Sequence, residues 1–160
     1  MSAPPVRPPY GSYAALVGVY SGALATAGLF ARVLRREPAC DTPLDFVILS
    51  AASFKVARVI SHDRVASFVR KPLVEGTAYD GEGEQPAGSG MQRALGELVT
   101  CTRCIGTWTA AGLASTQILA PGFGRLLTWS LAASAANDFL QGAFSVLVAK
   151  ANELEELVSG

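Results

Sequence analysis

Residues 13–31 read YAALVGVYSGALATAGLFA, an apolar run without a charged side chain. At a rise of about 1.5 Å per residue, a helix of this length measures about 28 Å, close to the thickness of the hydrocarbon core of a bilayer. Arg32, Arg35 and Arg36 follow the run and are typical of the end of a membrane segment, not of a signal-peptide cleavage site. The stretch therefore predicts a first membrane-spanning helix.

Three further apolar segments follow, at residues 43–61, 104–120 and 126–149. The segment at 43–61 also carries the basic residues Lys55 and Arg58, so it predicts a less hydrophobic helix that needs protein neighbours. Together with the first run, these segments predict an all-α fold. We expect a polytopic membrane helix bundle with about four transmembrane helices.

The chain divides into three parts by composition. Residues 1–12 are rich in proline and predict an extended lead-in, because proline cannot hold a helix interior. Residues 13–150 form the predicted transmembrane domain. Residues 151–160 alternate apolar and acidic side chains at helical spacing, which predicts a short amphipathic tail.

One long polar connection, residues 63–100, separates the second and third predicted spans. Its centre, residues 81–90, is rich in glycine and has the composition of a mobile linker. The two flanks, residues 64–69 and 91–99, mix charged and apolar side chains in patterns that favour short helices on the membrane surface.

The overall composition agrees with a membrane protein. Charged residues make up 16% of the 160 residues, against about 25% in soluble domains, and the mean hydropathy is +0.33. The formal net charge is zero, which gives no electrostatic reason to expect nucleic acid or an acidic substrate as a partner. No nucleotide-binding loop or catalytic set of side chains is evident, so an enzyme is not favoured.

The lysines and arginines of the connections predict the orientation, since basic residues are retained in the cytoplasm. With four spans and a cytoplasmic N-terminus, the inner side holds Arg7, Arg64, Arg70, Lys71, Arg93, Arg103 and Lys150. The outer side holds Arg32, Arg35, Arg36 and Arg125. We therefore expect a multi-pass protein of a bacterial inner membrane with both termini in the cytoplasm. In the alternative, residues 43–61 form a re-entrant or interfacial helix, which leaves three spans.

Three blocks of the sequence resemble a known family. They are ASFKVARVISHD at residues 52–63, VRKP at 69–72 and GELVTCTRCIGTW at 96–108. Their residues and order are similar to the bacterial family catalogued as domain of unknown function 1360, some members of which are described as sporulation proteins of the membrane. The motif residues of this resemblance are Asp63, Arg70, Pro72 and Glu97. The resemblance implies membrane residence and a real second helix, and it implies no activity.

Cys101 and Cys104 form a Cys-x-x-Cys pair at the start of the third predicted span. Such a pair binds structural zinc only with two further ligands, and no second pair is present, so zinc here would need a partner chain. Thiols at the start of a helix can also be reactive. The simplest interpretation is two cysteines that pack in the protein, reduced because the cytoplasm is reducing. Beyond this possible zinc ion, no cofactor is expected.

Charged groups inside a bilayer are costly and are usually paired or functional. Lys55 and Asp138 lie equally deep in their predicted spans, about 18 Å from the outer ends. Arg58 lies one turn deeper, at the level of Gln141. We therefore expect a polar seam between the second and fourth helices, with Asp138 paired to Lys55 or Arg58 and with Asn137 or Gln141 as a further partner. The pair would fix helix register or form a path for protons or ions.

Two classes of function fit these features. The first is a structural or interaction component of a membrane assembly, embedded in the lipid bilayer. The second is a small transporter, or a membrane-bound thiol or metal protein. Small residues spaced four apart let helices approach closely and favour a protein partner or a homo-oligomer. Such pairs are Gly18 with Gly22 and Ser130 with Ser134.

Overall fold

The computed structural model describes residues 8–36, 42–76 and 83–159, which fold as helices apart from one small hairpin. The longer helices are α1 (Tyr10–Val33), α2 (Pro43–His62), α4 (Gly90–Thr100), α5 (Thr102–Leu119) and α6 (Pro121–Ser159). Between α2 and α4 lie the 3-10 helix η1 (Arg64–Ala66), the short α3 (Ser67–Arg70) and the strands β1 (Val74–Glu75) and β2 (Gln85–Pro86). The strands pair antiparallel. The all-α class expected from the sequence is confirmed.

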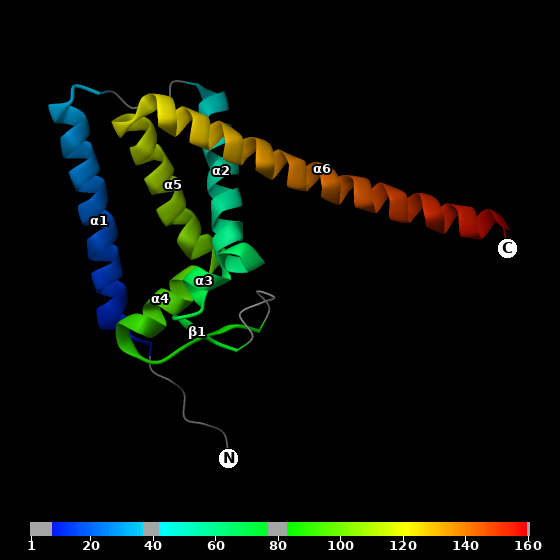
Figure 1. The fold of residues 1–160 in the computed structure, drawn as a ribbon, viewed down its shortest axis with the longest axis horizontal. Helices are drawn as coiled ribbons and strands as arrows, with labels where there is room; N and C mark the ends of the chain where they lie inside the picture. Colours follow the sequence, from blue (N-terminus) through cyan, green and yellow to red (C-terminus); the bar gives the residue numbers. More distant parts are fainter. Residues whose placement is uncertain (1–7, 37–41, 77–82, 160) are drawn as a thin grey trace, which may run out of the picture.

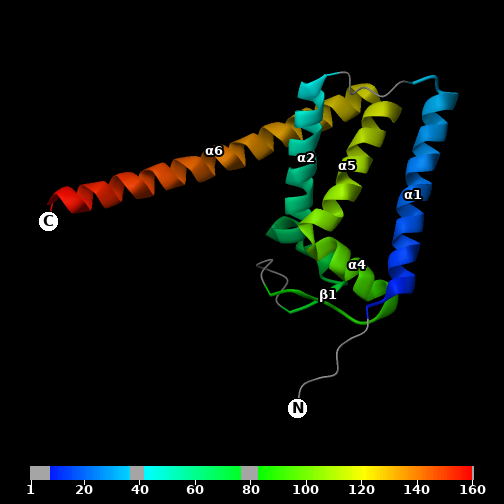
Figure 2. The same ribbon diagram turned by 180° about the vertical axis from the view of Figure 1, so that it is seen from behind.

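Three helices run side by side, with α5 between α1 and α2 (Figure 1). The short helix α4 and the hairpin lie at one end of this layer, and the C-terminal end of α1 and the N-terminal end of α2 lie at the other. Helix α6 starts at that other end, packs across α2 and α5, and then leaves the bundle obliquely (Figure 2). Its C-terminal half projects away from the rest of the chain.

The predicted segments correspond to observed helices, with changes at their ends. Residues 43–61 and 104–120 correspond to α2 and α5. The segment predicted at 126–149 is too short, because α6 already begins at Pro121, where a proline fits the first turn of a helix. The tail is not a separate element but the last turns of α6.

The N-terminal lead-in is also shorter than predicted. Helix α1 begins at Tyr10, directly after Pro9, since a proline outside the helix removes no helical hydrogen bond. Residues 1–7 lie outside the described part of the chain. The flanks of the polar connection do form short helices, and part of the predicted linker, residues 85–86, forms strand β2. Residues 77–82 lie outside the described part.

Two of the helices, Tyr10–Val33 and Pro121–Glu155, are long and apolar enough to cross a membrane. Helix α2 is apolar enough on average but carries three charged residues, Asp45, Lys55 and Arg58. In α5, Arg103, Gln117 and the threonines lower the mean hydropathy. The structure thus gives two candidate spans where the sequence predicted four.

Helix α2 lies at the centre of the packing. Its N-terminus is capped by Thr42, whose hydroxyl oxygen accepts a hydrogen bond from the Asp45 backbone amide at 3.2 Å. The buried residues of α2 are Ile48, Ala52, Ser53, Ala57 and Ser61. Most of them are small, so α5 and α6 approach the helix closely. The Thr109 hydroxyl of α5 donates to the Ser53 carbonyl at 3.2 Å, which ties the two helices together.

At the other end of the layer, the hairpin packs tightly against α4. A Cβ atom on Gly96 would lie 2.4 Å from the Leu73 carbonyl oxygen and 3.0 Å from the Pro86 side chain, so only glycine fits there. The Ala87 amide donates to the same Leu73 carbonyl at 2.9 Å. Gly96 therefore permits the contact that holds the hairpin under the helices.

Candidate functional site

The structure brings Lys55 of α2 and Asp138 of α6 together. The Lys55 ammonium nitrogen lies 2.7 Å from an Asp138 carboxylate oxygen. The Lys55 side chain is 16% exposed and that of Asp138 40% exposed. Beside this ion pair, the rings of Phe54 and Phe139 stack at 5.7 Å. The pair joins the two helices at the place where α6 leaves the bundle.

The other members of the expected polar seam lie apart from this pair. Arg58, Asn137 and Gln141 are exposed, and none of their side chains forms a hydrogen bond with the described residues. The geometry therefore supports one ion pair between α2 and α6, without a continuous row of polar side chains. Such a pair fixes the register of the two helices.

A second ion pair lies at the hairpin end and is almost completely buried. The Arg70 guanidinium donates to both carboxylate oxygens of Glu84, at 2.9 and 3.2 Å, and the two side chains are 0% and 2% exposed. It also donates to the carbonyl oxygens of Ile60 and Asp63, at 2.8 and 3.0 Å. Arg70 therefore joins the end of α2 to the residue directly before strand β2 of the hairpin.

The sequence identified Arg70 and Asp63 through the family motif, but it did not identify Glu84. That residue lies in a stretch with linker composition, where a carboxylate is normally solvated, and no local pattern indicates that the stretch folds back. The third motif residue, Pro72, takes part through its carbonyl oxygen, which accepts from the Gln92 side-chain amide at 3.1 Å. Arg70 and Asp63 are thus bonded to each other, whereas the fourth motif residue, Glu97, bonds Tyr13 and Arg93 instead.

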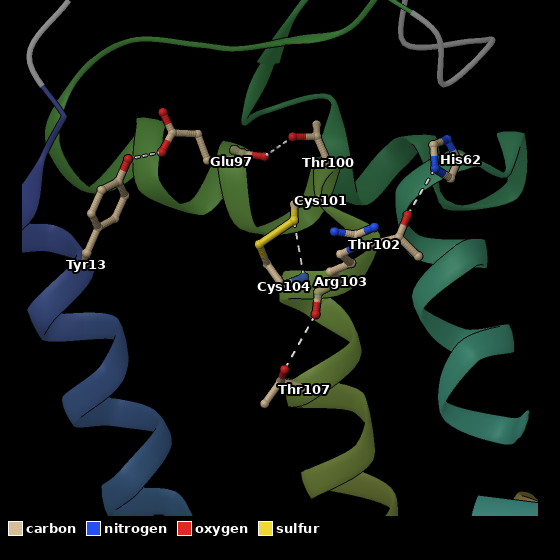
Figure 3. The surroundings of a disulfide bond; sticks show 10 residues. Tyr13, His62, Glu97, Thr100, Cys101, Thr102, Arg103, Cys104 and Thr107 are labelled. Carbon is tan, nitrogen blue, oxygen red and sulfur yellow. Dashed lines mark hydrogen bonds between the residues drawn. A yellow bond between two sulfur atoms is a disulfide. The ribbon is translucent and has the colours of Figure 1, made fainter. Parts of the chain in front are cut away.

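Cys101 and Cys104 lie where α4 meets α5 and are joined by a disulfide bond (Figure 3). Cys101 is the N-cap of α5, and its sulfur accepts a hydrogen bond from the Cys104 amide at 3.2 Å. The extended backbone of the cap and the first helical turn bring the two Cα atoms to 5.2 Å, within the usual range for a disulfide. The reduced pair expected from the sequence is therefore wrong for this structure.

Two hydrogen-bonded pairs flank the disulfide, one on each side (Figure 3). On one side, the Tyr13 hydroxyl of α1 donates to the Glu97 carboxylate of α4. Arg93 also donates to this carboxylate, at 3.1 Å. On the other side, His62 of α2 lies 3.1 Å from the Thr102 hydroxyl. The Tyr13 contact was not predicted, because it depends on how α1 packs against α4.

A cleft of about 490 Å³ opens beside the disulfide, between α1, α4 and α5. Its walls are mainly apolar and aromatic, and they include Cys104 and Glu97. The aromatic rings in the walls are those of Tyr13, Tyr20 and Trp108. Those of Tyr20 and Trp108 meet edge to face at 5.2 Å. The cleft therefore places a Cys-x-x-Cys pair beside an apolar cavity of the size that small molecules occupy.

The described residues contain no group of three or more histidine, cysteine, aspartate or glutamate side chains that could hold a metal ion. His62 is bonded to Thr102, and the disulfide leaves neither sulfur as a thiolate ligand. A zinc ion at Cys101 and Cys104 would require reduction of the pair and ligands from another chain.

The conserved-family model described as "Protein of unknown function (DUF1360)" matches residues 48–144. The match begins in the first turns of α2 and ends in the middle of α6. The chain belongs to this family. The DUF1360 region contains the two buried or half-buried ion pairs and the Cys-x-x-Cys pair, whereas α1 and the projecting end of α6 lie outside it.

A curated relative is the UPF0713 protein YngL of Bacillus subtilis (strain 168). It is 27% identical over 120 residues, which cover 71% of this chain and 88% of the relative. No solved structure gives a significant match. Since neither the family description nor the relative's name states an activity, the function of this DUF1360 chain has to be argued from its own structure.

Proposed function

We propose that this chain is a multi-pass protein of the bacterial inner membrane and a structural or interaction component of a membrane assembly. The observation that carries the proposal is the exposure of apolar side chains along α1 and α6, which are both long enough to cross a bilayer. Leu29 and Phe30 of α1 and Phe144 and Leu147 of α6 are all largely exposed. In water such surfaces would associate, whereas in lipid they are stable.

In the proposed topology, α1, α2, α5 and α6 all cross the membrane. Helices α2 and α5 are less hydrophobic, but they pack against each other and α6 covers part of both. The apolar part of α6, residues 121–149, would measure about 43 Å, longer than the roughly 30 Å of a hydrocarbon core. A long segment can cross by tilting. Figure 1 shows α6 running more across than along α1, α2 and α5, so the proposed topology requires α6 to be steeper in the membrane than in this structure.

The intramembrane charges of α2 fit this topology. Lys55 is paired with Asp138, which lowers the cost of both charges. Arg58 is exposed and lies about one turn from the end of α2 at His62. Its long side chain can extend to the lipid headgroups at the hairpin end.

The charge distribution favours the hairpin end as the cytoplasmic one, since basic residues are retained there. Around that end lie Arg64, Arg70, Lys71, Arg93 and Arg103. At the opposite end lie Arg32, Arg35, Arg36 and Arg125. Both termini would then be cytoplasmic, with the end of α6 emerging around Lys150.

The interaction role rests on the surface of α1. A Cβ atom added to Gly18 or Gly22 would meet nothing within 4 Å, so this small-residue face is open to another helix. Faces of this kind let two membrane helices pack closely. The expected partner is a second copy of this chain or another membrane protein.

The test is extraction of the tagged chain from bacterial membranes, followed by purification in mild detergent. We expect the chain to stay in the membrane pellet during alkaline carbonate washing and to co-purify with itself or with one defined protein. A Gly18→Leu, Gly22→Leu variant should lose the partner, and a Gly142→Leu variant on α6 serves as the matched control. Release by carbonate would refute membrane integration. A stable monomer without partners would favour a transporter that uses the Lys55–Asp138 pair.

A further inference from the structure

The disulfide lies beside the first of two adjoining apolar clefts. A second cleft, of about 250 Å³, shares Tyr20 and Trp108 with the cleft at Cys104 and runs between α1 and α5. Its other lining residues are Ala23, Leu24, Ala27, Ala111, Gly112 and Ser115. The two clefts therefore adjoin at the Tyr20 and Trp108 rings, which contact each other at 5.2 Å. A ligand with a compact head beside Cys104 and an apolar tail between α1 and α5 would have to pass these two side chains.

The two cysteines differ in surroundings as expected for a reactive pair. Cys104 is exposed and lines the cleft, whereas Cys101 is half-buried at the N-cap of α5. The Cys104 amide points at the Cys101 sulfur and, with the helix dipole, stabilises a thiolate there after reduction. The Cys104 sulfur thus lies at the cleft, whereas the Cys101 sulfur is placed where a negative charge is stabilised.

A purely structural role explains this disulfide poorly. The bond joins residues only three apart, and the stabilisation from a disulfide is smallest for the shortest loops. In the proposed topology the pair lies at the cytoplasmic end, where disulfides are usually transient and take part in redox chemistry. A reducing compartment would supply electrons to the pair, and an acceptor is then needed in the cleft.

We propose that Cys101 and Cys104 pass two electrons to a quinone bound in the cleft, with its ring beside Cys104 and its isoprenoid tail between α1 and α5. The two S–H bonds break and the S–S bond forms. Both electrons and both protons go to the quinone, whose two carbonyl oxygens become the hydroxyls of the hydroquinone. The pair is reduced again by cytoplasmic dithiols, which become disulfides.

The residues that line the cleft beside Cys104 suit a quinone ring. Tyr13, Tyr20 and Trp108 offer ring faces and edges for a planar ring, and aromatic pairs prefer such contacts. Glu97 and the Tyr13 hydroxyl are polar groups within the same wall, able to exchange protons with a quinone oxygen. A water-soluble protein thiol would gain nothing from the apolar cleft between α1 and α5. This activity goes beyond the proposed structural role, but its supply of electrons rests on the proposed topology, which puts the cysteines at the cytoplasmic end.

The test uses the full-length Cys40→Ser chain, purified in detergent, reduced with dithiothreitol and desalted under anaerobic conditions. Decylubiquinone is the probe, because its fully substituted ring does not form adducts with thiols. We expect one equivalent of quinone to be reduced per chain, with simultaneous loss of two alkylatable thiols. Cys101→Ser and Cys104→Ser should each abolish the reaction.

A bulky side chain in the cleft between α1 and α5 distinguishes reduction of a bound quinone from general thiol chemistry. An added Cβ on Gly112 meets nothing within 4 Å, so Gly112→Leu should fold and fill the space of the tail. We expect it to slow decylubiquinone reduction at least tenfold while a tail-less ubiquinone reacts as before. Gly142→Leu on α6, which lies outside both clefts and meets nothing within 4 Å, is the matched control and should leave the rate unchanged. Equal rates for the Gly112→Leu and control chains, or no reduction by the Cys40→Ser chain, would overturn the proposal.

Discussion

Two ion pairs connect segments that are far apart in this chain, Arg70 with Glu84 and Lys55 with Asp138, and they differ in how deeply they are buried. Arg70 and Glu84 are 0% and 2% exposed, and the guanidinium makes four hydrogen bonds. Lys55 and Asp138 are 16% and 40% exposed and share one contact. The buried pair fixes a local fold at the hairpin end, and the half-exposed pair of Lys55 and Asp138 holds α6 at the point where it leaves the bundle. Burial and the number of partners, not the distance between charges, should therefore decide the energetic weight of each pair.

The largest effect is expected at the buried pair. Arg70→Met leaves the Glu84 carboxylate buried and unpaired, so we expect the free energy of unfolding to fall by about 3–5 kcal/mol. Reversible unfolding in mixed detergent micelles, followed by circular dichroism, measures this change. The double variant Arg70→Met, Glu84→Gln should be more stable than the sum of the two single losses implies. Strict additivity would mean that the pair is not coupled.

The next effect concerns the packing that encloses the buried pair. Gly96→Ala forces a methyl group against the Leu73 carbonyl, so we expect a loss of about 1–3 kcal/mol in the same measurement. Gly18→Ala is the matched control, since a methyl group there meets nothing and alanine favours a helix over glycine. Equal effects of the two substitutions would show that the hairpin does not pack on α4 as described.

The half-exposed pair of Lys55 and Asp138 should contribute less to the free energy of unfolding. Lys55→Met or Asp138→Asn should lower the free energy of unfolding by about 0.6–1.7 kcal/mol, the range found for polar contacts between membrane helices. The double variant should recover part of this loss, because no unpaired charge remains. Arg58→Met serves as the control and should show no coupling to Asp138. A coupling energy of zero between Lys55 and Asp138 would contradict the role of the pair in holding α6.

The smallest effect is expected where both partners are exposed. Lys150 and Glu153 lie 2.8 Å apart near the end of α6, with side chains 62% and 59% exposed. Lys150→Met should change the free energy of unfolding by less than about 0.5 kcal/mol. A loss as large as that at Lys55 would show that the projecting end of α6 is covered by something that binds Lys150.

The sequence predicted the contact at Lys55 because depth along two helices is a simple function of residue number. Helical rise alone placed Lys55 and Asp138 at one level. It could not decide between Lys55 and Arg58 as the partner of Asp138, since that depends on the rotation and crossing of α6. The start of α6 was predicted five residues too late, because Pro121 resembles a stop signal until its place at the first turn is known.

The site around the cysteines was only partly predictable. The spacing of Cys101 and Cys104 identified the pair, and the family motif identified Glu97. The cleft beside them needs Tyr13 and Tyr20 from α1, which lies outside the family match and carries no motif. Glu84 had no sequence signal either. Contacts between segments far apart in the chain depend on tertiary packing, which periodicity does not encode.

In the proposed topology, the chain crosses the membrane with the hairpin end in the cytoplasm. Single cysteines at Gly122 and Glu75, both exposed and at opposite ends of the helical layer, report on this orientation in a chain whose native cysteines are serine. In intact spheroplasts, a membrane-impermeant maleimide should label Gly122→Cys, and it should label Glu75→Cys only after lysis. Labelling of Glu75→Cys in intact spheroplasts, or of both positions alike, would contradict the account.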